Sequence, residues 1–159
     1  MAIRVRPRGT RGAGFPGPLM WLFKLFGGQQ LRMYRRDGGQ SLSRRMGFPV
    51  VLLTTRGAKT GQPRTAAIGG FPDGGSAWLV VASLGGSANH PAWFLNMAKH
   101  PDDIWLEVGR ERFKVRGQTL EGQDRTDALD RIASISPRYG TYQQKTDREI
   151  PIVRLEREA

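Results

Sequence analysis

The chain has 159 residues, of which 38% are hydrophobic and 9% aromatic, so it is long enough to bury a core as one domain. It has no cysteine, which excludes disulfides, thiolate metal sites and cysteine nucleophiles, and its two histidines argue against a multi-histidine metal site or a Ser-His-Asp triad. The net charge of +11 falls mostly on residues 1–45, which carry +9, and this argues against a nucleic-acid-binding role for the rest.

The N-terminal part of the chain has two sections of different composition. Residues 1–17 are rich in Arg, Gly and Pro and are predicted to be a disordered basic leader. Residues 18–45 begin with the apolar run PLMWLFKLF, which is shorter than the roughly 20 residues that span a bilayer. Two interpretations stay open for this predicted amphipathic helix. Residues 18–36 lie on the inner surface of the membrane, or the helix covers the domain or a partner subunit.

From residue 46 to residue 159 the pattern changes to short strands and a few helices, and this section is predicted to be the folded domain. Strands are predicted at residues 49–55, 64–71, 76–83, 103–108, 111–120 and 150–156. Helices are predicted at 89–100, where Asn89 is the expected cap, and at 122–135, and a turn or short helix at 136–148. This order of elements favours a small antiparallel β-barrel of about six strands with short peripheral helices.

The turn between the first two strands, TRGAKTGQPR, concentrates three cations, Arg56, Lys59 and Arg64. It is not a P-loop, because its lysine precedes the second glycine and a strand follows instead of a helix. Two interpretations remain at this point. The turn is either a solvated basic hairpin or a binding site for an anionic group.

Three separated segments between Val50 and Glu156 resemble one known family. LLTTRGAKTGQPRTAAI, WLVVASLGGSANHPAWFLN and YGTYQQKTDREIPIVRLE are similar to segments of the actinobacterial deazaflavin-dependent nitroreductases, in the same order and with similar spacing. The resemblance implies a mainly β (α+β) fold, a split β-barrel, and the use of coenzyme F420, a 5-deazaflavin with a phosphate and an oligoglutamate tail. It also implies hydride transfer from the reduced coenzyme to an electron-poor acceptor, quinone-like or nitroaromatic.

The same resemblance assigns roles to particular residues. The turn would hold the anionic tail, while the end of the third strand and the following loop and helix would border the ring. The implied coenzyme-binding residues are Gly57, Lys59, Gly61, Gln62, Pro63, Arg64, Ala82, Ser83, Leu84, Gly85 and Trp93. The residues themselves allow plainer interpretations, since a serine that ends a strand often bonds its own turn, and a tryptophan at helical spacing is often part of the core.

Tyr139, Tyr142 and Ser83 are the implied catalytic residues. The two tyrosines are three apart, which places them on one side of a helical turn, and each joins a flat apolar ring to a hydroxyl. The chain departs from the family pattern at Ala58, where a second cation is frequent, and at Gly69 and Ser136, where tyrosines occur in nitroimidazole-activating members. These two losses are expected to open space near the substrate and to disfavour nitroimidazole activation.

Two rival functions stay open from the sequence. One is a split-barrel oxidoreductase that binds FMN, whose short single-phosphate tail needs fewer cations than this turn provides. The other is a non-enzymatic module that binds membranes or nucleic acid through its basic leader. The preferred expectation is a cytoplasmic F420-dependent enzyme, peripheral on the inner face of the plasma membrane and able to form a homodimer.

Overall fold

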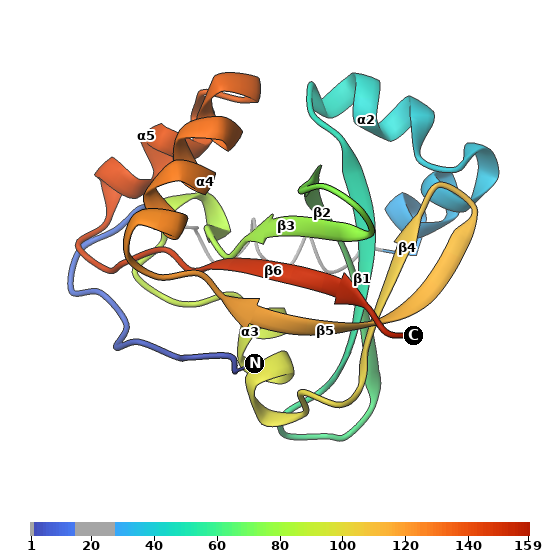
Figure 1. Cartoon of the computed structure of the whole chain (residues 1–159), viewed down its shortest axis with the longest axis horizontal. Helices are drawn as coiled ribbons and strands as arrows, with labels where there is room; N and C mark the ends of the chain where they lie inside the picture. Colours follow the sequence, from blue (N-terminus) through green and yellow to red (C-terminus); the bar gives the residue numbers. More distant parts are fainter. Residues whose placement is uncertain (1, 15–27) are drawn as a thin grey trace.

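The computed structural model describes residues 2–14 and 28–159, and its centre is a closed barrel of antiparallel strands (Figure 1). Around the barrel the strands follow the order β1-β2-β3-β6-β5-β4. Their bounds are β1 Val50–Arg56, β2 Pro63–Pro72, β3 Ala77–Val81, β4 Ile104–Val108, β5 Glu111–Thr119 and β6 Ile152–Arg157. The predicted six-stranded antiparallel barrel is therefore confirmed.

The apolar residues of the strands belong to two clusters, each of which also contains helix residues. In β1, Val51 and Leu53 belong to the cluster that draws residues from β3, β4, β5 and β6, whereas Val50 and Leu52 face the other cluster, with residues of α2, α4 and α5. Successive residues of a strand point to opposite faces, so β1 is covered on both sides. This double burial explains why the sequence shows a continuous apolar run in β1 and no alternation.

Short helices surround the barrel. Their bounds are α2 Gln40–Met46, the 3-10 turn η1 Leu84–Gly86, α3 Ala92–Lys99, α4 Gly122–Ile135 and α5 Arg138–Lys145. Figure 1 shows α4 and α5 side by side near the ends of β3 and β6, and α2 apart from them on the other side. The prediction of Asn89 as the cap of α3 was wrong. Pro91 occupies that position, and its fixed φ suits a helix start.

Residues 2–14 contain no helix or strand, but they run along the domain and make specific contacts. The amides of Gly9 and Ala13 donate to the carbonyls of Ala88 and Gly86 at 2.8 and 3.0 Å. The carboxylate of Asp147 accepts bonds from the Thr10 hydroxyl and from two amides, which lowers its pKa to about 2. The expectation of a disordered leader, drawn from composition, did not foresee these contacts.

The predicted membrane-binding run PLMWLFKLF lies outside the described residues. Residues 28–37 are helical and precede α2, and Arg32, Arg35 and Arg36 are exposed on this stretch. Within the two described parts of the chain, no helix is both long enough and apolar enough to cross a membrane.

Candidate active site

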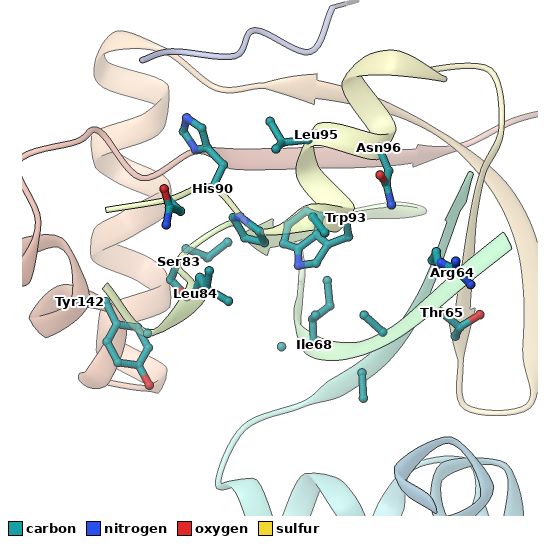
Figure 2. Close-up of a pocket in the computed structure, with 18 of the residues that line it drawn as sticks. Arg64, Thr65, Ile68, Ser83, Leu84, His90, Trp93, Leu95, Asn96 and Tyr142 are labelled. Carbon is teal, nitrogen blue, oxygen red and sulfur yellow. The ribbon is translucent and has the colours of Figure 1, made fainter. Parts of the chain in front are cut away.

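A cavity of about 1010 Å³ opens where the β1–β2 turn, β2, the loop after β3, the start of α3 and helix α5 meet (Figure 2). Nine of the thirteen residues predicted for the site line it. They are Gly57, Lys59, Arg64, Ser83, Leu84, Gly85, Trp93, Tyr139 and Tyr142. The other four, Gly61, Gln62, Pro63 and Ala82, do not line it and lie in the chain segments that shape its walls.

The turn between β1 and β2 is held in shape by its own backbone. The amide of Gly57 donates to the carbonyl of Gln62 at 2.8 Å, and the amide of Gly61 donates to the carbonyl of Gly57 at 2.8 Å. Gly61 has a φ of +70°, a conformation that costs little only for glycine. Gly61 and Gln62 therefore fix the turn, while Gly57 and Lys59 form part of the cavity wall.

Asn96 of α3 ties this turn to the helix. Its side-chain carbonyl accepts a bond from the amide of Ala58 at 2.9 Å, and its amide group donates to the hydroxyl of Thr55 at 3.2 Å. Asn96 is buried, so both bonds are made away from water, where an unpaired amide is costly. Asn96 therefore joins α3 to the cationic turn.

The three cations of the turn have different surroundings. Arg56 forms a 2.8 Å ion pair with Asp103 on the outer side of the barrel, and this bond lowers the pKa of the Asp103 carboxyl. Lys59 and Arg64 line the cavity, and neither forms an ion pair with the residues that the structure describes. One end of the cavity therefore presents two cations that are free to bind an anion.

At the other end, the chain leaves β3 through a tight loop that begins at Ser83. Leu84 has a φ of +43° and is the one non-glycine residue with positive φ within residues 2–14 and 28–159. Such backbone strain in a non-glycine residue is frequent at functional sites. Figure 2 shows Ser83 and Leu84 near Tyr142 and far from Arg64, with Trp93 and Ile68 between the two ends.

Tyr139 and Tyr142 lie together on the first turns of α5, as their spacing predicted. Their rings meet edge to face at 5.6 Å, and Phe48 and Phe71 pack against the ring of Tyr139 in the same manner at 5.7 and 5.5 Å. Burial raises the pKa of the Tyr139 hydroxyl to about 12, and the nearby Tyr142 adds to this effect. Tyr139 is therefore a rigidly held phenol that keeps its proton at neutral pH.

Gly69 of β2 lies directly beneath Tyr139. A Cβ atom at this position would collide with the Tyr139 hydroxyl and would stand 3.1 Å from the ring of Phe48. The space expected from the missing side chain is thus occupied by Tyr139. Ser136 does not line the cavity and is buried at the end of α4, so the expectation that it opens the substrate site was wrong.

The substitution Gly69→Ala is expected to destabilise the fold by about 1–3 kcal/mol, because the new methyl group forces Tyr139 out of its position. Chemical denaturation measures this loss. Gly140→Ala on α5 is a matched control, since its Cβ would meet only Ala133 at 3.7 Å and alanine favours a helix. Equal stability of the Gly69→Ala and wild-type proteins would contradict the packing described.

Several lining residues were not predicted from the sequence. Met46 and Phe48 come from the segment before β1, and His90 precedes α3; further members are Thr60, Thr65, Ala67, Ile68, Asn89, Leu95 and Arg138. Arg138 lies over the ring of Phe48, 5.0 Å from its centre, and donates to the carbonyl of Met46 at 3.1 Å. Cavity membership of these residues depends on how distant segments meet, which no local motif indicates.

Comparison with known proteins gives a consistent result. The family model described as F420H(2)-dependent quinone reductase matches residues 28–157. An F420H(2)-dependent quinone reductase of Mycobacterium tuberculosis (strain ATCC 25618 / H37Rv) is 39% identical over 145 residues, covering 86% of this chain and 96% of that protein. The solved structure of an F420-H2 dependent reductase is 34% identical with a TM-score of 0.61, covering 68% of this chain and 94% of that one. A second solved structure, described as a domain-swapped dimer, is 30% identical with a TM-score of 0.62 and covers 88% of this chain and 100% of that one.

Proposed function

The chain belongs to the F420H(2)-dependent quinone reductase family, and from this premise we propose that it binds coenzyme F420 and reduces a quinone with it. The observation that carries the proposal is the cavity itself. It joins Lys59 and Arg64, which form no ion pair within residues 2–14 and 28–159, to an apolar middle and to a far end with a strained loop and a buried phenol. A ligand with an anionic tail, a flat ring and a reactive edge matches this order of surfaces.

The residues fit the coenzyme on chemical grounds. Lys59 and Arg64 suit its phosphate and carboxylates, because a guanidinium forks onto anionic oxygens and an ammonium supplies a point charge. Trp93 and Ile68, between the two ends of the cavity, offer apolar surface to a flat ring. Neighbouring amides of the turn and of the Ser83 loop add donors without charge.

The reduced coenzyme supplies a hydride, and the chain's task is to hold the acceptor beside it and to stabilise the charge that develops. The Tyr139 hydroxyl donates a hydrogen bond to the acceptor oxygen that gains charge, with Ser83 as a second donor. Its raised pKa keeps the Tyr139 proton in place for this bond. Tyr142 and the apolar wall orient the acceptor ring and exclude water, so that donor and acceptor stay at the roughly 3–3.5 Å that transfer requires.

Direct titration of the purified protein tests the coenzyme. Oxidised F420 and FMN are added separately and the change in their fluorescence is followed, after which a soluble quinone and a nitroaromatic compound are compared as oxidants of the reduced coenzyme. We expect tight F420 binding, weak FMN binding and faster turnover with the quinone. Uptake of FMN without F420 would overturn the proposal in favour of the FMN enzyme, and binding of neither would favour a non-enzymatic module.

We also propose that the protein binds the surface of an anionic membrane, from which a lipophilic quinone is reached. The supporting observation is that Arg44 and Arg45 are exposed at the end of α2, directly before Met46, which lines the cavity. Exposed arginines near a lipid surface each contribute about 1 kcal/mol of attraction. The cavity mouth and the basic surface are therefore next to each other in the chain.

The variant Arg44→Glu/Arg45→Glu is expected to lose about tenfold or more in binding to vesicles that contain phosphatidylserine. Co-sedimentation with the vesicles measures the loss, and neutral phosphatidylcholine vesicles give the background. Lys114→Glu is the control, because Lys114 lies on β5 and faces Glu158. Equal vesicle binding by all three proteins would remove the membrane from the proposal.

A homodimer is a further proposal, supported by the similar solved structure that is described as a domain-swapped dimer. Light scattering on the protein as it elutes from a size-exclusion column distinguishes one chain of 17.7 kDa from a dimer of twice that mass.

A further inference from the structure

Arg148 is a buried arginine that does not line the cavity. It is 3% exposed, and none of the carboxylates that the structure describes forms an ion pair with it. Burial lowers the pKa of its guanidinium. A charge held away from water without a counter-ion is costly unless its N–H groups all make hydrogen bonds.

Three of the hydrogen bonds of Arg148 go to the chain just after β3. The guanidinium donates to the carbonyls of Ala82 at 3.0 Å, Ser83 at 2.9 Å and Ser87 at 2.8 Å. It thus holds both ends of the loop Ser83–Ser87. Three carbonyl dipoles aimed at one cation replace the missing counter-ion.

A fourth contact links the Arg148 guanidinium to His90, with 3.3 Å between a guanidinium nitrogen and the histidine Nδ1. A guanidinium has only donors, so Nδ1 accepts, and the His90 Nε2–H donates to the carbonyl of Arg6 at 2.6 Å. The tautomer of His90 follows from its two partners. Arg148 is therefore at the centre of a network that includes the N-terminal segment and a residue of the cavity wall.

The consequence for the cavity follows from the planarity of the peptide bond. In a trans peptide the C=O and the next N–H point in opposite directions. Carbonyls of Ala82 and Ser83 that face Arg148 therefore turn the amides of Ser83 and Leu84 away from it. Neither amide has a hydrogen-bond partner in the described ranges 2–14 and 28–159, and both residues line the cavity (Figure 2).

We propose that Arg148 is a positioning residue that turns the Ser83 and Leu84 amides into the cavity, where they donate to the oxygen atoms of the coenzyme ring. This inference rests on the proposed function for the identity of the ligand, but the orientation of the loop does not. Because Arg148 fixes the two peptide groups through their carbonyls, the two amide donors are preorganised and ligand binding does not have to order them. The strained φ of Leu84 is maintained by the same bonds.

The test compares Arg148→Lys with Arg125→Lys. Lysine keeps the charge, but its compact ammonium lacks the guanidinium fork that spans both ends of the loop. Arg125 is a matched control, because it also donates to a carbonyl, that of Ile150 at 2.7 Å, and does not line the cavity. We expect Arg148→Lys alone to raise the F420 dissociation constant about tenfold. We also expect faster hydrogen exchange of the Gly86 and Ser87 amides in the ligand-free protein, because these amides donate to the carbonyls of Ser83 and Leu84 within the loop that Arg148 holds.

An unchanged dissociation constant and unchanged loop exchange in Arg148→Lys would overturn the inference. Should that variant fail to fold, nuclear magnetic resonance on the wild-type protein decides. The Ser83 and Leu84 amide signals must shift and become protected from exchange when oxidised F420 is added. If the signals do not change, the inference about Arg148 is overturned equally. If the wild-type protein binds no F420, the proposed function fails, while the exchange of the ligand-free loop still reports on Arg148.

Discussion

Removal of both cavity cations in Lys59→Ala/Arg64→Ala should raise the dissociation constant for F420 by about a hundredfold. Each exposed charge-assisted bond to an anionic tail contributes about 1.5 kcal/mol at the low end of its range, and two of them give about 3 kcal/mol. Fluorescence titration at fixed ionic strength measures the change. Added salt should weaken the wild-type complex more than that of the double variant, since the charges are solvent-accessible.

Two comparisons make this expectation specific to the tail. Arg56→Ala removes a cation from the same turn, but that cation is already paired with Asp103, so the F420 dissociation constant should change less than threefold. The bare deazaflavin ring, which lacks the phosphate and glutamates, should bind the wild type and the double variant equally. If the double variant also fails to bind the bare ring, its cavity has been disrupted, and the loss of F420 binding cannot be assigned to the tail contacts.

Tyr139→Phe should lower kcat by about a hundredfold, with little change in the dissociation constant for F420. The phenylalanine keeps the edge-to-face packing on Phe48, Phe71 and Tyr142 and removes only the hydroxyl. Removal of one preorganised donor to a developing negative charge costs about 10²–10³ in rate. Single-turnover mixing of reduced coenzyme, enzyme and a quinone measures the chemical step.

The pH profile provides a second measurement of the same hydroxyl. The pKa of Tyr139 is raised to about 12 and the ordinary tyrosine value is about 10, so the donor stays protonated below pH 10. The wild-type rate should therefore show no loss from tyrosine ionisation between pH 6 and 9. Because the raised pKa favours the folded, protonated state, its stabilising contribution is lost as the pH rises from about 10 to about 12. Tyr142→Phe is the matched control, and an equal loss of rate in it would refute the special role of Tyr139.

The barrel was predictable because its signals are local. The apolar run in β1, the alternation of Phe113 and Val115 with basic residues in β5, and the Gly-rich turns each specify a strand or a hairpin within a few residues. The cationic turn and the two tyrosines were found in the same way. Their roles in catalysis and coenzyme binding remain predictions, but their convergence on one cavity is a finding of the structure.

The parts that the sequence did not indicate depend on contacts between distant residues. Asn96 bonds to an amide 38 positions earlier, and Arg148 bonds to carbonyls more than 60 positions earlier. Both side chains bond to backbone groups. Since every residue carries such groups, the sequence does not indicate which of them will be bonded. Gly69 shows the converse, because a missing side chain suggests open space until the fold places Tyr139 in it.

The contacts of residues 2–14 affect how membrane binding can be tested by removing the N-terminal segment. Gly12 lies so close to the backbone at Ala88 that a Cβ atom would not fit, and the amide of Ala13 donates to the carbonyl of Gly86, within the loop that borders the cavity. A protein that lacks residues 1–14 would lose these bonds together with most of its basic leader. Slower turnover of such a truncated enzyme would therefore report a loosened cavity wall as much as a lost anchor, and a bulky affinity tag fused before Ala2 would carry the same risk.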